Sequence, residues 1–177
     1  MNRSTKRSNH EKVKLLTDAG SQAQSFMEIG FNMGHSSNSM REINPDITES
    51  VHFDLCKHEY VKPNFDMYAD NYKNAELVCG NSLETVPQYI QNNLNKKFDV
   101  VHVDGGHSFD VALGDIKNAC KLVKTGGPVI IDDCDLSTVN RCLNGAVKTA
   151  VEENIIKVMF DGGSGAGASN ILAVCHE

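Results

Sequence analysis

Apolar and polar residues alternate along the chain in blocks that predict strands separated by helices. Short apolar runs predict strands, because a parallel strand that is covered on both faces is apolar along most of its length. The predicted strands are 25–29, 51–54, 76–79, 98–103, 128–131, 155–160 and 171–175. The predicted helices are 11–19, 35–40, 83–93 with Ser82 as its N-cap, 109–123 and 137–153. Residues 60–72 are expected to be helical or irregular, with an interruption at Pro63.

This order of elements predicts an α/β fold with a doubly wound, mostly parallel sheet of seven strands. The last two strands are joined by the glycine-rich stretch 161–170, which has no room for a helix. Such a link fits an antiparallel hairpin, so the last strand is expected to run against the others. Residues 161–169 are read as a plain hairpin connection, with a mobile lid as the alternative.

Composition narrows the class of protein. The chain has 177 residues, of which 40% are apolar and 23% charged, as in an ordinary globular domain. We expect one domain over 11–177, preceded by a flexible basic end at 1–10 whose alternative role is contact with substrate or RNA. A formal net charge of -6 argues against general nucleic-acid binding. No apolar run is long enough for a membrane span, and the first residues contain no signal core.

The cysteines bear on the cellular compartment. There are six, and none forms a C-x-x-C pair: Cys56, Cys79, Cys120, Cys134, Cys142 and Cys175. Their segments are strand-like or helical, which favours reduced thiols over a disulfide framework or a zinc site. We therefore expect a cytoplasmic protein.

The stretch 25–36, SFMEIGFNMGHS, predicts a strand, a tight turn and the start of a helix. Glycine at positions 30 and 34 lets the backbone come close to a ligand, because glycine tolerates positive φ and has no Cβ. A dinucleotide-binding turn has G-x-G-x-x-G, and here Asn32 stands in place of its second glycine. The N–H groups at the start of the helix favour electron-rich ligand groups.

Acidic or amide side chains lie at or just after the ends of the first five predicted strands: Glu28, Asp54, Asn81, Asp104, and the pair Asp132 and Asp133. Because the carboxyl ends of parallel strands lie at one edge of a sheet, these groups are expected to converge on one crevice. Asp54 lies 24 residues after Gly30, where a carboxylate can accept hydrogen bonds from both hydroxyls of a ribose. The alternative for Asp54 is a solvated loop acid.

Two of these segments resemble a known family. Glu28 followed by G-x-x-x-G is similar to the first motif of class I S-adenosylmethionine-dependent methyltransferases. Residues 98–109, FDVVHVDGGHSF, resemble the D-G-x-H segment of a subgroup with metal-dependent sugar O-methyltransferases of macrolide biosynthesis and cephalosporin hydroxylase relatives. The resemblance extends from Phe26 to Cys175 and implies a Rossmann-like domain that binds S-adenosylmethionine. The cofactor contacts it implies are Glu28, Gly30, Asn32, Gly34, Asp54, Asn81, Ser82 and Asp104.

The resemblance also implies a divalent cation, with Asp104, Asp132 and Asp133 as ligands. Three carboxylates in one cleft repel one another unless a cation neutralises them, and oxygen ligands suit Mg²⁺. His107 lies where catechol-type enzymes carry a lysine base, and a histidine can take a proton near neutral pH. His102, inside its strand, is expected to be a core histidine with its hydrogen bonds satisfied.

The expected activity is O-methylation of a small-molecule hydroxyl, with His107 and Asp104 as catalytic residues. One alternative is a metal-dependent hydroxylase relative with iron in the site. Another is a non-catalytic S-adenosylmethionine binder or a partner subunit. The N-terminal part provides little cover for a substrate, so either the site is open or a homo-oligomer completes it.

Overall fold

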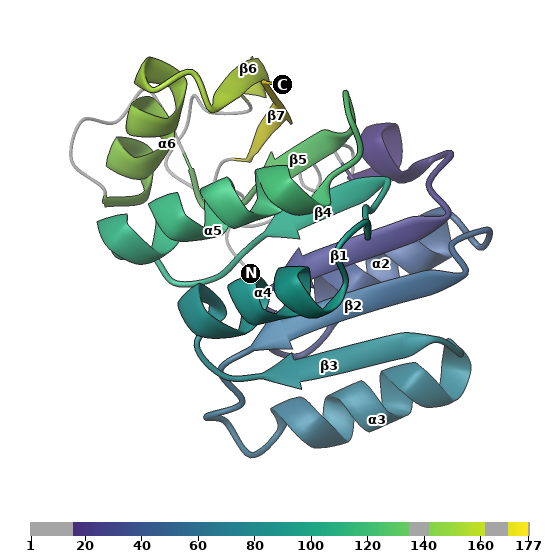
Figure 1. The fold of residues 1–177 in the computed structure, drawn as a ribbon. Coiled ribbons are helices and arrows are strands. Elements are labelled where there is room, and N and C mark those ends of the chain that lie inside the picture. The colour runs from purple at the N-terminus through teal and green to yellow at the C-terminus, as the bar shows by residue number, and fades with distance from the viewer. Residues whose placement is uncertain (1–15, 135–141, 162–169, 177) are drawn as a thin grey trace, which may run out of the picture.

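Figure 1 shows the computed structural model, which describes residues 16–134, 142–161 and 170–176. The strands are β1 (Ser25–Ile29), β2 (Glu49–Asp54), β3 (Ala75–Cys79), β4 (Val100–Val103), β5 (Pro128–Ile131), β6 (Ile156–Asp161) and β7 (Ile171–Cys175). The helices are α2 (His35–Ile43), α3 (Val61–Asn71), α4 (Ser82–Asn92), α5 (Phe109–Leu122) and α6 (Cys142–Glu152). Residues 16–20 are also helical. Among the described residues, no helix has the length and apolar character needed to cross a membrane.

The strands form one sheet in the order β3-β2-β1-β4-β5-β7-β6. The first five strands pair in parallel, whereas β7 runs antiparallel to both of its neighbours, β5 and β6. This topology confirms the predicted α/β sheet and the hairpin between its last two strands. The strand order reverses between β1 and β4, and such a switch point opens a crevice at the carboxyl edge of a sheet.

Helices cover both faces of the sheet, and Figure 1 shows α4 and α5 in front of the strands with α2 behind them. On β1, Met27 belongs to the core under α4, α5 and α6, and Phe26 belongs to the core under α2. Side chains alternate between faces along a strand, so Glu28 lies on the α2 side with Phe26. In register with Glu28 are His52 of β2 and His102 of β4. A row of three ionisable side chains therefore crosses the buried middle of this face.

Two predictions about helix starts are wrong. Pro63 does not interrupt α3, because it lies in the first helical turn, where a backbone N–H has no acceptor inside the helix. Ser82 is the first residue of α4, and the N-cap is Asn81, whose side chain accepts a hydrogen bond from the Leu83 N–H at 3.2 Å. Asparagine is among the residues that helix N-caps prefer.

Some predictions fall on residues that the structure does not describe. They are the flexible end at 1–10, the start of the helix 11–19, the start of the helix 137–153, and the lid or plain connection over 162–169. The described part of 137–153 is α6, which confirms a helix at this point of the chain.

The interpretation of the cysteines as reduced thiols is wrong for two pairs. Cys56–Cys79 and Cys120–Cys175 are disulfides whose partners are 23 and 55 residues apart in sequence. Cys134 is a buried thiol that donates to Asn144 Oδ1 at 3.2 Å. The pairing was hidden because only strand register and helix packing bring these residues together. Cytoplasmic localisation, which we expected partly from reduced thiols, loses that support.

The disulfide between Cys120 and Cys175 is expected to stabilise the fold, because it ties α5 to the last strand and closes a long loop in the unfolded chain. Replacing both cysteines with serine should lower the free energy of unfolding by about 2–4 kcal/mol. Urea unfolding without reductant measures this loss. The difference should vanish when wild type and variant are unfolded in reductant. A difference of the same size in reductant would show that packing, and not the disulfide, causes it.

Candidate active site

A cavity of about 320 Å³ opens at the carboxyl ends of β1 to β4. Its lining includes the residues at or just after the ends of these strands: Ile29, Gly30, Asp54, Gly80, Asn81, Ser82, Asp104 and Gly105. Of the eight predicted cofactor contacts, it brings together Gly30, Asn32, Asp54, Asn81, Ser82 and Asp104. This volume lies in the range of small-molecule and cofactor pockets, which is about 300–1,000 Å³.

The turn after β1 requires glycine at its first position. Gly30 has φ of 98°, and a Cβ placed there would lie 2.0 Å from the backbone carbonyl oxygen of Asp104. The turn therefore passes directly against the end of β4, and any side chain at position 30 would separate the two. Asn32 also has positive φ, at 51°, which asparagine tolerates better than most residues. The turn is thereby held open toward the cavity.

The Asp54 carboxylate is oriented by two backbone groups. Its Oδ2 accepts a hydrogen bond from the Asn32 N–H at 2.8 Å, and its Oδ1 accepts one from the Cys56 N–H at 2.7 Å. Each carboxylate oxygen can accept a second hydrogen bond. The side chain is thus fixed at the cavity wall with acceptor capacity left for a ligand that donates two hydrogen bonds.

Glu28 and Gly34 do not line the cavity. Glu28 is 1% exposed and takes hydrogen bonds on the inner side of the sheet, at 3.0 Å from His102 Nδ1 and 3.2 Å from His52 Nδ1, and also from the Ser37 hydroxyl. Burial alone would raise the pKa of Glu28, but the contacts with His102 and His52 outweigh it and lower the pKa to about 2. Gly34 is the N-cap of α2. Glu28 therefore affects the cavity indirectly, because its hydrogen bonds hold β1, β2 and β4 together.

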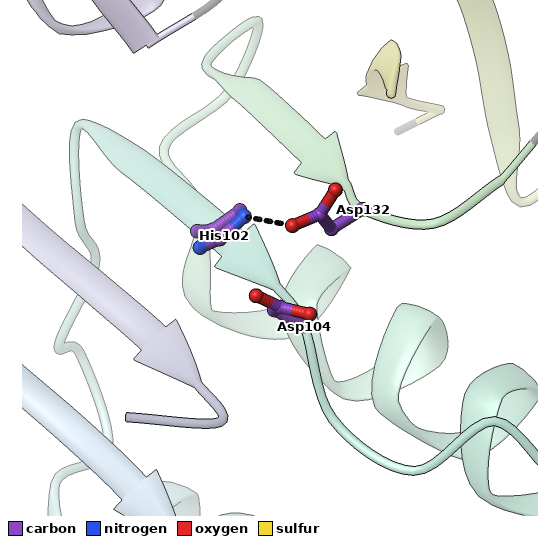
Figure 2. A group of neighbouring side chains, drawn as sticks. All are labelled: His102, Asp104 and Asp132. Carbon is purple, nitrogen blue, oxygen red and sulfur yellow. Dashed lines mark ion pairs between the residues drawn. The ribbon is translucent and has the colours of Figure 1, made fainter. Parts of the chain in front are cut away.

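A group of potential metal ligands lies at the ends of β4 and β5. His102, Asp104 and Asp132 each offer one ligand atom, and these atoms lie within 4.8 Å of one another. Figure 2 shows the three side chains turned toward a common point, with the ion pair between His102 and Asp132 marked. The second ring nitrogen of His102, Nε2, has no hydrogen bond within the described part of the chain. His102 is a core histidine as expected, and its Nδ1 contacts Glu28, but the expected hydrogen bond at Nε2 is absent among the described residues.

A second group shares Asp104 with the first and lies nearer to solvent. It consists of Asp104, His107 and Asp133, with His107 Nε2 3.5 Å from Asp133 Oδ2. The predicted ligands Asp132 and Asp133 thus fall into different groups. The predicted base His107 lies beside one of the predicted ligands.

Asp115 of α5 is a buried acid that the sequence analysis missed. Neither carboxylate oxygen has a hydrogen-bond partner among the described residues, and a Cβ at Gly105 would lie 2.7 Å from Oδ2. Burial raises the pKa of Asp115 from 3.8 to about 6, although the nearby Ser82 hydroxyl opposes this rise. The signal in the sequence is an acid on the buried stripe of α5 that includes Ala112, Ile116 and other apolar residues.

Solved structures show which fold this is. The S-adenosylmethionine complex of the O-methyltransferase TomG from Streptomyces achromogenes, involved in tomaymycin synthesis, matches with TM-score 0.72 and 21% identity over 94% of this chain and 80% of its own. The SAH complex of an O-methyltransferase from Bacillus cereus matches with TM-score 0.71 and 18% identity, over 95% of this chain and 81% of its own. The N-methyltransferase NodS from Bradyrhizobium japonicum matches with TM-score 0.69 and 12% identity, over 97% of each chain. The fold is that of class I methyltransferases.

The family is shown by the sequence itself. A family model described as a methyltransferase domain matches residues 27–134, which is more than half of the chain. The chain therefore belongs to this methyltransferase domain family. No curated protein matches the sequence. The matched segment begins in β1 and ends just after the two aspartates that follow β5, so it contains both the glycine turn and the candidate metal ligands.

The raised pKa of Asp115 predicts a pH-dependent cost to stability. The folded protein holds the Asp115 proton more tightly than the unfolded chain. Protonated Asp115 therefore stabilises the fold fully below about pH 4, and this stabilisation is lost as pH rises through 6. Asp115→Asn removes the ionisable group. It should raise the free energy of unfolding by up to about 3 kcal/mol at pH 7.5 relative to wild type, and by little at pH 4.

Urea unfolding at the two pH values measures this effect, and Asp70→Asn on the exposed side of α3 is the control. An equal change at both pH values for Asp115→Asn would contradict the raised pKa.

Proposed function

We propose that this protein is an S-adenosylmethionine-dependent methyltransferase that methylates a hydroxyl group of a small molecule with the help of a divalent cation. The cavity at the ends of β1 to β4, with the Asp54 carboxylate fixed on its wall, is the observation that carries this proposal. The O-methyltransferases among the structures of the same fold favour a hydroxyl acceptor.

The residues around the cavity suit the proposed cofactor. Asp54 has free acceptor capacity for the two ribose hydroxyls, and Gly30 removes a side chain where a ligand would approach the backbone. Asn81 and Ser82 line the cavity after β3, and we assign this end of it to the adenine. Asp104 lines the cavity after β4, at the opposite end. S-adenosylmethionine, when bound, supplies an electrophilic methyl group. The protein has to hold the cofactor in one orientation and keep the acceptor oxygen in line with it.

The acidic residues beyond the cavity suit a divalent cation. The proposed ligands are Asp104, which belongs to both ligand groups, with Asp132 from the buried group and Asp133 from the exposed one. The ion would hold the acceptor hydroxyl and make its proton more acidic. The buried Nε2 of His102 has no hydrogen bond among the described residues and lies close to Asp104 and Asp132, which supports a cation at this place. His107 takes the hydroxyl proton, and the Asp133 carboxylate, 3.5 Å from its Nε2, attracts the positive charge that the ring gains. His107 is half exposed, so the proton can pass on to water.

The cofactor site is tested by calorimetric titration of S-adenosylhomocysteine into the protein, with Mg²⁺ and with EDTA. Wild type should bind in both conditions. Asp54→Asn keeps the shape of the side chain but loses its charge, and removal of charge-assisted hydrogen bonds should weaken binding about 10- to 100-fold. Asp66→Asn on the exposed side of α3 is the matched control. No binding by wild type in either condition would refute the proposed cofactor.

Catalysis is tested with labelled S-adenosylmethionine and a panel of hydroxylated acceptors, with and without EDTA. His107→Gln should lower the rate of methyl transfer about 10²- to 10⁴-fold with unchanged S-adenosylhomocysteine binding, because it removes only the base. His176→Gln, at an exposed position after β7, is the control. Binding without transfer to any acceptor would favour the non-catalytic binder, and oxidation of an acceptor with iron would favour the hydroxylase relative.

A further inference from the structure

His102 is placed by the sheet so that one ring nitrogen faces the two aspartates. It lies two residues before Asp104, and side chains two apart on a strand share a face. The next strand, β5, pairs in parallel with β4, and the Asp132 N–H donates to the Val103 carbonyl at the end of that ladder. Figure 2 shows His102 from within β4 and Asp132 from the end of β5 pointing toward each other, with Asp104 beside them.

The orientation of the ring is fixed from the opposite side. His102 Nδ1 is 3.0 Å from Glu28 Oε1, and because a carboxylate accepts hydrogen bonds the proton is assigned to Nδ1. Nε2 is therefore the nitrogen that faces the aspartates, at 4.0 Å from Asp132 Oδ2. A carboxylate that holds one ring nitrogen while the other binds a metal is the usual arrangement around metal-binding histidines.

The environment of Nε2 calls for a partner. His102 is fully buried, and Nε2 has no hydrogen bond within the described residues. A buried polar atom without a partner costs about 1–3 kcal/mol. Imidazole nitrogen and carboxylate oxygen are both ligands that divalent transition metals take, and His102 Nε2 and Asp132 Oδ2 lie 4.0 Å apart. A cation thus satisfies the nitrogen and neutralises the neighbouring carboxylates.

We propose that His102, Asp104 and Asp132 bind a divalent transition-metal ion, with Glu28 as the positioning residue for the His102 ring. Imidazole suits Mn²⁺, Fe²⁺, Co²⁺ and Zn²⁺ better than it suits Mg²⁺ or Ca²⁺, which prefer oxygen. The inference deepens the proposed function, on whose cation it rests. It replaces a magnesium site of three aspartates by a site with one nitrogen ligand. Asp133 remains with His107 on the solvent side.

The test uses Mn²⁺ and the full chain, with pulsed electron paramagnetic resonance and calorimetry. Wild type should bind Mn²⁺ more tightly than Mg²⁺, and the bound Mn²⁺ should show coupling to an imidazole nitrogen. His102→Asn should abolish the coupling and weaken Mn²⁺ binding at least about tenfold. The control is His176→Asn, because His176 is an exposed histidine after β7, outside the Glu28 network. This control should keep the coupling.

Glu28→Gln tests the positioning role. It should weaken Mn²⁺ binding about 10- to 100-fold, as expected for a residue that orients a ligand, and should keep the nitrogen coupling. Because the wild-type spectrum needs no variant, the inference stays testable even where a substitution prevents folding.

Bound Mn²⁺ without nitrogen coupling in wild type would overturn the inference, and so would equal affinity for Mn²⁺ and Mg²⁺. If methyl transfer nevertheless requires Mg²⁺, the proposed function stands and only the histidine ligand fails. If no ion binds while S-adenosylhomocysteine does, the cation fails in both proposals and only the proposed cofactor site stands.

Discussion

The buried carboxylate of Glu28 is the interaction on which the carboxyl edge of the sheet depends. A carboxylate inside a protein must be hydrogen-bonded or paired, and Glu28 meets this requirement through His52 of β2, His102 of β4 and Ser37 of α2. Removal of any one partner would leave buried polar groups unsatisfied. The network therefore fixes three neighbouring strands and a helix relative to one another at the base of the cavity.

This constraint sets the spacing of the groups that face a ligand. Gly30 follows Glu28 by two residues, and its N–H donates to the Phe53 carbonyl, one residue before Asp54. On the other side of β1, the Asp104 N–H donates to the Ile29 carbonyl. The glycine turn and both functional acids are thus attached to the same short stretch of hydrogen-bonded backbone. A rigid stretch of backbone of this kind suits a reaction in which a cofactor and an acceptor have to be held in line.

The sequence predicted the positions of Asp54 and Asp104 well, because the end of a parallel strand is marked by the change from apolar to polar residues and topology brings such ends together. It did not predict the partners of His102, because alternation gives the face of a strand but not the register with its neighbours. The disulfide between Cys56 and Cys79 was missed for the same reason. Pro63 was misread because the first turn of a helix tolerates proline, which depends on where the helix starts.

The two histidines near Asp104 differ in their exposure to solvent, and this difference suits them to different roles. The side chain of His102 is 0% exposed and that of Asp132 is 7% exposed, whereas His107 and Asp133 are 57% and 35% exposed. The buried Nε2 of His102 faces Asp132 and Asp104, so this ring suits a ligand. A proton taken up by His107 can leave to solvent, so this ring suits a base. The shared Asp104 joins the buried group to the exposed one. In the proposed reaction, an acceptor that enters from solvent would therefore meet His107 before a cation held by the buried group.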